Sequence, residues 1–282
     1  MNRIVVPVDF STTSEKAFEY ALHIAAKTKG SIMLYHNYKP LESPFVDTVA
    51  AREAYNNTML QDHELQLTAF KNKVSAAWPG ITITTVVEPA PLIDNLLEYI
   101  HAREADLIVM GTQGATGLKK VIIGSVAERV VKKSPIPVLL VPENFEWKDP
   151  SCFVFATSFE PADRHALQTV LPIAKAFGAS VTVVHLSSDY LSHAEKEQEQ
   201  AAFNQYAQLL QSEFSEEQLS FKLAHTSSLL TGMETLHHSI PYDLAVLVRR
   251  EKTFLEKFFI DSFTTNMAYV TRWPLLVVPA VH

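Results

Sequence analysis

The feature that most constrains this chain is an internal repeat of alternating strand-like and helix-like segments. An offset of 149 residues aligns residues of the same type in the two halves: Val5, Phe10, Ala17, Leu22, Ser31 and His36 with Val154, Phe159, Ala166, Leu171, Ser180 and His185. Further along, an offset of 137 residues aligns a second set: Leu92, Asp106, Ser125, Pro137 and Pro142 with Leu229, Asp243, Ser262, Pro274 and Pro279. Self-similarity of this kind indicates a duplicated unit. We therefore predict two domains, 1–143 and 150–282, with a linker at 142–150.

Within the first copy, short apolar and β-branched runs alternate with amphipathic segments. The runs that we interpret as strands are Arg3–Val8, Ser31–Tyr38, Ile81–Val87, Leu107–Met110 and Val138–Val141. The segments that we interpret as helices are Ser14–Lys29, with Thr12 or Thr13 as its cap and Gly30 as its stop, then Asp47–Trp78, Pro91–Ala105 and Ser125–Ser134. Such alternation is typical of a doubly wound parallel sheet with right-handed crossovers. The predicted fold class is α/β, with two tandem domains of five strands each. Sheets of this kind bind ligands at the carboxyl ends of their strands.

A glycine-rich stretch lies between the fourth strand and the last helix of the first copy. It reads MGTQGATGLKKVIIGS over Met110–Ser125 and contains Gly111, Gly114, Gly117 and Gly124. Glycines let backbone N–H groups approach a ligand closely, and a helix N-terminus attracts anions. The spacing differs from both the P-loop and the dinucleotide-binding motif. The stretch therefore predicts an anion site of another kind, most often one for phosphate.

Composition and charge argue against several classes of protein. The length of 282 residues suits two domains, and a formal net charge of -7 disfavours broad binding to nucleic acid or to an anionic membrane. Cys152 is the single cysteine, which rules out an internal disulfide and a metal site built on several thiolates. We find neither a signal peptide nor an apolar run near the ~20 residues that span a membrane. A cytoplasmic protein is expected.

Three motifs of the first half resemble the universal stress protein family, and the tandem layout resembles its two-domain members. The motifs are VPVDFS at residues 6–11, the loop G-x2-G-x9-G-S formed by Gly111, Gly114, Gly124 and Ser125, and PIPVLLVP at residues 135–142. The resemblance implies a Rossmann-like fold of the adenine nucleotide alpha hydrolase type. It also implies that the first domain binds ATP, with Mg2+ accompanying the nucleotide.

The same resemblance implies a set of ligand contacts in the first domain. Near adenine and ribose it places Pro7, Val8 and Asp9, with Asn37 facing the base. Along the ribose and phosphates it places Met110, Gly111 and Gly114, and at the helix start, holding the phosphates, Gly124, Ser125 and Val126. A carboxylate at a strand end, such as that of Asp9, can accept hydrogen bonds from both ribose hydroxyls. No residue is predicted to bind a metal, because no pair of histidines has the spacing of ligands on one helix face.

Each of these residue types also has a purely structural interpretation. Ser125 and Glu128 fit a capping box, Asp9 could cap the first helix, and the glycines could serve turns. The second copy tests the last of these, because its counterparts of Gly111, Gly114, Gly117 and Gly124 are Val248, Glu251, Phe254 and Asp261. The serine is kept as Ser262, whereas Asp9 is replaced by Ser158. We therefore interpret the glycines as dispensable for the fold and needed for a ligand, and the second domain as degenerate.

The resulting prediction is an ATP-binding protein that acts as a nucleotide-dependent regulator in a stress response. Nucleotide occupancy would be reported to a protein partner of unknown identity. The two domains would pair through Val138–Val141 and Leu275–Val278 as an intramolecular pseudo-dimer, and a homodimer is left open. One alternative is a slow ATPase on the same fold, and another is an interaction module that binds no nucleotide. No catalytic residue is predicted, because the glycine stretch contains no convincing general base and the hydrolase motif G-x-S-x-G is absent.

Overall fold

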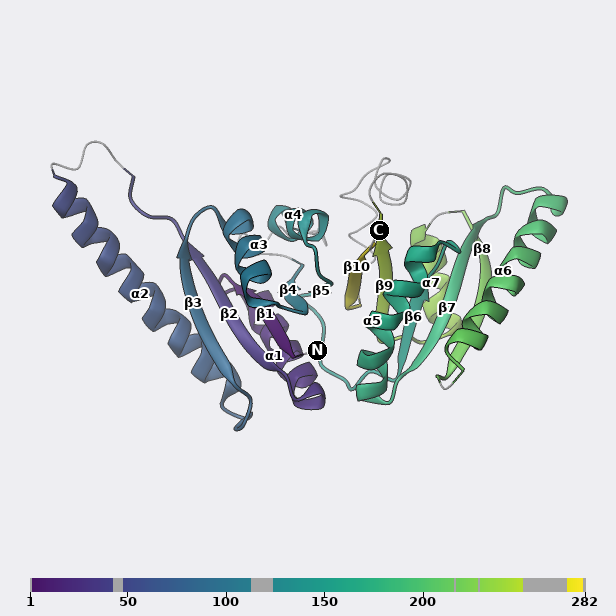
Figure 1. The fold of residues 1–282 in the computed structure, drawn as a ribbon, viewed down its shortest axis with the longest axis horizontal. Coiled ribbons are helices and arrows are strands. Elements are labelled where there is room, and N and C mark those ends of the chain that lie inside the picture. Colours follow the sequence, from purple (N-terminus) through teal and green to yellow (C-terminus); the bar gives the residue numbers. More distant parts are fainter. Residues whose placement is uncertain are drawn as a thin grey trace. The chain divides into compact units, whose positions relative to one another are not determined.

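The computed structural model describes residues 2–42, 48–112, 124–215, 217–227, 229–250 and 273–280. The chain forms two compact units, and along the sequence the first gives way to the second between Glu143 and Asn144. Each unit is an α/β domain (Figure 1). Gly114, Gly117 and most of the second copy's counterpart of the glycine stretch lie outside the described residues.

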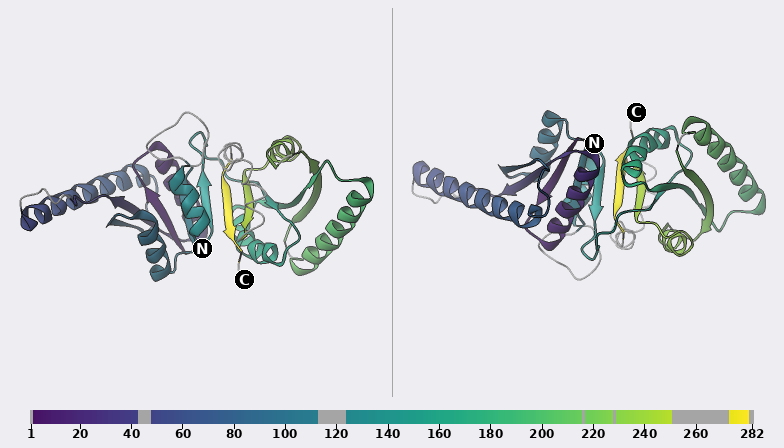
Figure 2. Two further views of the ribbon diagram at one scale, coloured as in Figure 1. Left: turned by 90° about the horizontal axis from the view of Figure 1, so that it is seen from above. Right: turned by 90° about the horizontal axis from the view of Figure 1, so that it is seen from below.

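The first domain is built on a five-stranded parallel sheet in the order β3-β2-β1-β4-β5. Its strands are β1 (Arg3–Val8), β2 (Ser31–Tyr38), β3 (Ile83–Pro89), β4 (Leu107–Gly111) and β5 (Val138–Val141). Its helices are α1 (Thr12–Thr28), α2 (Val49–Ser75), α3 (Leu92–Arg103) and α4 (Ser125–Lys133). Right-handed crossovers put α1 and α2 on one face of the sheet and α3 and α4 on the other (Figure 2). The predicted doubly wound sheet is confirmed.

The second domain repeats this topology, with strands in the order β10-β9-β6-β7-β8 and every described pairing parallel. Its strands are β6 (Cys152–Ala156), β7 (Ser180–Ser188), β8 (Leu219–Thr226), β9 (Leu244–Arg249) and β10 (Leu275–Pro279). Its described helices are α5 (Pro161–Phe177), α6 (His193–Glu213) and α7 (Leu229–Ser239). In each domain the first strand lies beside the second and the fourth, so the tandem duplication predicted from the repeat is present in the fold.

The central strands are covered on both faces, which explains their unbroken apolar character. Val6 in β1, Leu34 in β2 and Val109 in β4 are each 0% exposed. Burying a side chain of this size contributes about 1.5–3 kcal/mol relative to leaving it in water. α1 buries Ala17, Phe18 and most of its other apolar residues, as its helical spacing predicts. This core fixes the carboxyl ends of the strands, where a ligand site would lie.

An aspartate at the start of the fourth strand ties down the first strand in both domains. Asp106 Oδ2 accepts hydrogen bonds from the backbone N–H groups of Asn2 (2.6 Å) and Arg3 (2.9 Å). Its repeat partner Asp243 does the same for Ser151 (2.7 Å) and Cys152 (3.1 Å). Burial alone would raise the pKa of Asp243, but the hydrogen bonds from Ser151, Lys148 and Cys152 together outweigh burial and hold that pKa below its usual value. The aligned aspartates are thus part of the repeated frame.

Several predicted element ends were wrong, for reasons that lie in local geometry. Ser11, and neither Thr12 nor Thr13, caps α1, because its side chain accepts a hydrogen bond from the Ser14 N–H at 3.1 Å. α1 ends at a left-handed Lys29 (φ 57°) and not at a glycine.

The third strand also differs from its prediction. It begins at Ile83 and not at residue 81, and it continues to Pro89, because its register with β2 runs from Ile32 to Tyr38. The ends of β3 are therefore set by its pairing with β2, and the sequence of β3 alone does not contain that information.

Candidate functional site

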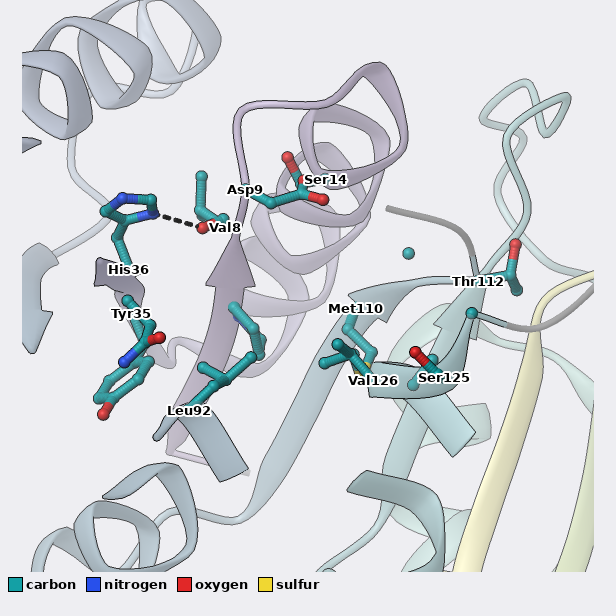
Figure 3. A pocket seen from close by; sticks show the side chains of 15 residues that line it. Val8, Asp9, Ser14, Tyr35, His36, Leu92, Met110, Thr112, Ser125 and Val126 are labelled. Atoms are coloured by element: carbon teal, nitrogen blue, oxygen red, sulfur yellow. Dashed lines mark hydrogen bonds between the residues drawn. The ribbon is translucent and has the colours of Figure 1, made fainter. Parts of the chain in front are cut away.

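A cavity of about 210 Å³ opens at the carboxyl ends of β1, β2 and β4, beside the start of α4 (Figure 3). The chain runs from β1 outward to β2 and β3, and then returns to place β4 on the other side of β1. The cavity therefore lies at the point where the strand order reverses, which is the usual ligand site of open α/β sheets.

All of the predicted site residues that the structure describes line this cavity. β1 and the residue after it contribute Pro7, Val8 and Asp9, and β2 contributes Asn37. β4 contributes Met110 and Gly111, and the start of α4 contributes Gly124, Ser125 and Val126. Gly114 lies outside the described residues. The structure thus brings together side chains that are separated by more than half of the first domain's sequence.

The start of α4 presents to the cavity backbone donors for which the described residues provide no acceptor. Gly124 is the N-cap, and no side chain in the described parts of the chain caps the helix, so the first intrahelical bond runs from the Glu128 N–H to the Gly124 carbonyl at 3.0 Å. The N–H groups of Ser125, Val126 and Ala127 precede that bond and have no acceptor within the helix. The Gly124 N–H itself donates to the Thr112 carbonyl at 2.6 Å. The amides of Ser125, Val126 and Ala127, which line the cavity, could therefore donate to an anion there, whereas that of Gly124 could not.

Two of the structural interpretations offered for these residues are wrong. Ser125 is the first helical residue and does not cap α4, so the capping box with Glu128 does not form. Asp9 does not cap α1 either, because that position belongs to Ser11. The exposed Asp9 carboxylate instead accepts hydrogen bonds from the Ser11 N–H (3.1 Å) and hydroxyl (2.5 Å), which fixes it at the rim of the cavity.

Gly111 has a packing role that the repeat did not reveal. A Cβ added to Gly111 would lie 2.5 Å from Cγ2 and 2.9 Å from Cβ of Thr13 in α1, closer than real side chains approach. The second domain accommodates Val248 at the matching position, but there the counterpart of Thr13 is the smaller Ala162. For Gly111, the interpretation that the glycine is dispensable for the fold was therefore incorrect: it lets α1 approach β4.

His36 closes the inner side of the cavity and is held in one tautomer. Its Nδ1 lies 2.7 Å from the Val8 carbonyl oxygen and must donate, so in the neutral ring Nε2 accepts from His63 Nδ1 at 2.9 Å. Burial lowers the pKa of His36, the neighbouring His63 lowers it further, and the Val8 bond opposes both. At neutral pH, His36 is therefore an uncharged residue with hydrogen bonds at both ring nitrogens.

Asn37 is oriented by the adjacent strand. Its Nδ2 donates to the carbonyl oxygens of Glu88 (3.1 Å) and Pro89 (2.7 Å), and two carbonyls around one amide nitrogen leave no doubt about which end is the NH2 group. This contact holds the end of β3 and the turn that leads to Leu92, another wall of the cavity. Asn37 thus shapes the site through β3, in addition to lining it.

Sequence reasoning missed several residues that line the cavity: Ser14, Tyr35, Leu92, Thr112 and Ala127. Ser14 and Ala127 lie in the first turns of α1 and α4, so the helical starts that carry the motifs could have pointed to them. Leu92 aligned with Leu229 in the repeat, but an apolar residue at a helix start carries no sign of a ligand. Tyr35 precedes His36 on a strand, and only the fold shows that it borders the site.

The described residues contain neither a cluster of metal ligands nor a membrane-spanning helix. Among them, no three His, Cys, Asp or Glu side chains are grouped so as to hold a metal ion. None of the helices in those parts of the chain combines the length and apolar character needed to cross a membrane.

Comparison with known proteins identifies relatives of both halves. The model of the family described as "Universal stress protein family" matches residues 1–142 and again residues 153–279. Universal stress protein MJ0531 of Methanocaldococcus jannaschii is 36% identical over 141 residues, which covers 49% of this chain and 81% of that protein. Universal stress protein YxiE of Bacillus subtilis is 27% identical over 145 residues, covering 50% of this chain and 98% of that protein.

The tandem arrangement also has a counterpart among solved structures. The crystal structure of a universal stress protein from Archaeoglobus fulgidus aligns with a TM-score of 0.68 at 18% identity, over 99% of this chain and 96% of that one. At that identity the likeness concerns the fold, and it extends over both domains. Because the family model matches both halves of the sequence, the chain belongs to the universal stress protein family.

Proposed function

We propose that the first domain binds ATP, accompanied by Mg2+, and that the protein acts as a nucleotide-dependent regulator in a stress response. The observation that carries the proposal is the start of α4, where three backbone N–H groups that lack an acceptor among the described residues line a cavity at the reversal point of the sheet. Family membership supports the regulatory part of the proposal. Both parts concern the first domain.

The residues around the cavity suit the separate parts of a nucleotide. Apolar walls from Pro7, Val8 and Met110 suit a base and sugar, and the Asp9 carboxylate offers acceptors for ribose hydroxyls. Phosphates would accept hydrogen bonds from the amides of Ser125 and Val126 at the positive end of α4. Mg2+ keeps several waters and is commonly held through substrate phosphates, so it needs few protein ligands.

A proline substitution at the start of α4 tests the amide contact directly. Ser125→Pro removes one N–H and the hydroxyl, and proline is well tolerated at the first helical position. Gly124 has φ -61° and ψ 148°, a conformation that a following proline accepts. The matched control is Ser125→Ala, which removes the hydroxyl and keeps the N–H.

We expect Ser125→Pro to bind ATP about 10- to 100-fold more weakly than Ser125→Ala, because a hydrogen bond to a charged group contributes about 1.5–3 kcal/mol. Isothermal titration of the full chain with ATP and Mg2+ measures this difference. Equal affinity of the two variants, or no binding by the unaltered chain at any accessible ATP concentration, would overturn the proposal.

The proposed regulatory role requires that ATP binding change the part of the protein that a protein partner recognises. Binding should slow hydrogen exchange of the N–H groups at residues 125–127, since these are the proposed donors. If saturating ATP left their exchange rates unchanged, a signalling role through this site would be untenable. Pairing of the two domains through their last strands stays a prediction.

A further inference from the structure

The loops that join the first strand to the first helix differ between the two domains in the placement of one carboxylate. In the first domain this loop and the first helical turn contain Asp9 and Ser14, and in the second they contain Ser158 and Asp163. The offset of 149 residues pairs Asp9 with Ser158 and Ser14 with Asp163, so the aspartate and the serine have exchanged positions. Each loop thus has one aspartate, at a different place.

In the first domain, the exchange leaves the carboxylate at the rim and a small hydroxyl inside. Asp9 is exposed and bonded to Ser11, whereas Ser14 is 4% exposed and donates from Oγ to the Ser11 carbonyl at 2.9 Å. Both Asp9 and Ser14 border the cavity (Figure 3). The space beside Ser14 stays open because its side chain is short and folds back on the loop.

In the second domain, the carboxylate of Asp163 is inside and fully engaged. The side chain is 0% exposed, and Oδ2 accepts hydrogen bonds from the Thr157 hydroxyl (2.8 Å) and the backbone N–H groups of Ser158 (2.9 Å) and Glu160 (3.3 Å). Oδ1 forms an ion pair with the guanidinium of Arg250, whose side chain is 16% exposed. The Asp163 carboxylate is thus surrounded by hydrogen-bond donors and a cation that could also bind another anion.

Arg250 stands at the end of a strand of the second domain whose counterpart in the first domain ends at the cavity. It directly follows β9, the counterpart of β4, and the offset of 137 residues pairs it with Gln113 in the glycine-rich stretch. The ion pair therefore links the end of the fourth strand to the first turn of the first helix. In the first domain the corresponding elements border the open cavity. A phosphate entering the second domain would have to displace a buried carboxylate from its amides and its arginine.

We propose that the residue at the third position of the first helix decides which domain accepts an anionic ligand. Ser14 leaves the first domain open to a phosphate-bearing ligand, whereas Asp163, held by Arg250, is a built-in occupant that closes the second domain to one. The statement about Ser14 rests on the proposed function, and the statement about Asp163 does not. The exchange of aspartate and serine between the two loops thus leaves one site for an anionic ligand in each chain.

The first experiment introduces the carboxylate of the second domain into the first. Ser14→Asp adds a negative charge to the wall of the cavity that the ligand phosphates would enter, without a counterpart of Arg250. Ser14→Asn is the matched variant of nearly the same size without the charge. Titration of each full-length variant with ATP and Mg2+ should give an affinity at least tenfold lower for Ser14→Asp than for Ser14→Asn. Thermal unfolding of both variants checks that the domain is folded.

Equal ATP affinity of these two folded variants would overturn the role of Ser14. If the unaltered chain did not bind ATP at all, the proposed function would fail instead, and the second experiment would still decide the part that concerns Asp163.

That second experiment empties the closed site of the second domain. Asp163→Ala in the full chain removes the carboxylate and leaves Arg250 and the loop N–H groups for an external anion. Sodium formate, which supplies a carboxylate of the right size, should raise the unfolding midpoint of Asp163→Ala by about 3 °C or more over sodium chloride at equal ionic strength. The unaltered chain should show no such difference. If formate and chloride acted alike on Asp163→Ala, Asp163 would not be an occupant of an anion site.

Discussion

The two domains hold the ends of their first strands in the same way and use the space beside them differently. In each, a left-handed phenylalanine follows the strand, Phe10 with φ 63° and Phe159 with φ 66°. Each ring lies against a histidine, His36 at 4.4 Å and His185 at 4.3 Å between centroids. The histidine Nδ1 donates to the strand's last carbonyl or the one after it, at 2.7 and 2.8 Å.

This shared geometry teaches which features belong to the fold. A non-glycine residue at positive φ often marks a functional site. Here it recurs in a domain whose corresponding site is filled by Asp163 and Arg250, so it is part of the frame. Among the differences that bear on a ligand are two at residues that line the cavity: Ser14 against Asp163, and Gly111 against Val248. Substitutions at these positions can break or sharpen the comparison.

The largest effect is expected from breaking the ion pair of the second domain. Arg250→Met leaves the fully buried Asp163 without its countercharge, and losing one partner of a buried pair costs about 3–5 kcal/mol. Urea denaturation of the full chain should show this loss in the transition of the second domain. Ser14→Ala, the control in the first domain, removes one hydroxyl hydrogen bond and should cost only about 1 kcal/mol. A loss below that of the control would show that the pair does not hold the second domain together.

A smaller effect is expected from filling the close contact of the first domain. Gly111→Ala puts a methyl group 2.5 Å from Thr13 Cγ2, and overpacking of this kind typically costs about 1–3 kcal/mol. Thr13→Ala in the same chain should recover much of the loss, because the second domain pairs Val248 with Ala162 at these positions. The free energy of unfolding of the single and double variants measures the coupling. Purely additive losses would mean that Thr13 is not what Gly111 accommodates.

The smallest effect is a dependence of stability on pH that differs between the domains. The folded-state pKa of His36 lies below its ordinary value of 6.5, mainly through burial, so the unfolded chain binds more protons as the pH falls below that value. The stability that neutral His36 provides is therefore complete above pH 6.5 and is lost as the pH falls towards the folded-state pKa. Replacing the titrating ring in His36→Asn should reduce the slope of the unfolding free energy against pH by at most the amount that one bound proton contributes.

The counterpart of His36 in the second domain, His185, has a carboxylate as its partner instead of a second histidine. His185 Nε2 lies 2.9 Å from Glu199 Oε1. Burial would raise the pKa of Glu199, but hydrogen bonds from Ser187 and His185 outweigh it and lower that pKa. The stability from Glu199 should persist well below pH 6.5 and be lost only as the pH falls below the ordinary value of 4.5.

Burial also lowers the pKa of His237, so this residue contributes to the pH dependence of the unaltered chain. His237 is unchanged in His36→Asn and in Glu199→Gln, so the difference between these variants reflects His36 and Glu199. Unfolding free energies between pH 4 and pH 8 provide the measurement. The same slope for both variants between pH 5 and pH 7 would contradict the difference.

The sequence by itself determined the fold class, the duplication and most of the cavity wall. Parallel strands covered on both faces are mostly apolar, so runs such as Arg3–Val8 and Val138–Val141 were predicted to the residue. The motif residues at strand ends converge because the carboxyl ends of parallel strands lie at one edge of the sheet. Local pattern and chain direction were enough for these conclusions.

The tertiary structure alone decided the roles that depend on a distant neighbour. Gly111 proved to be a contact for Thr13, and Asp163 a partner of Arg250, although each pair is separated by tens of residues in the sequence. The third strand took its ends from its register with β2. Close packing and charge pairing are set by which atoms meet across the core, and a sequence pattern records the type of each residue without recording what it touches.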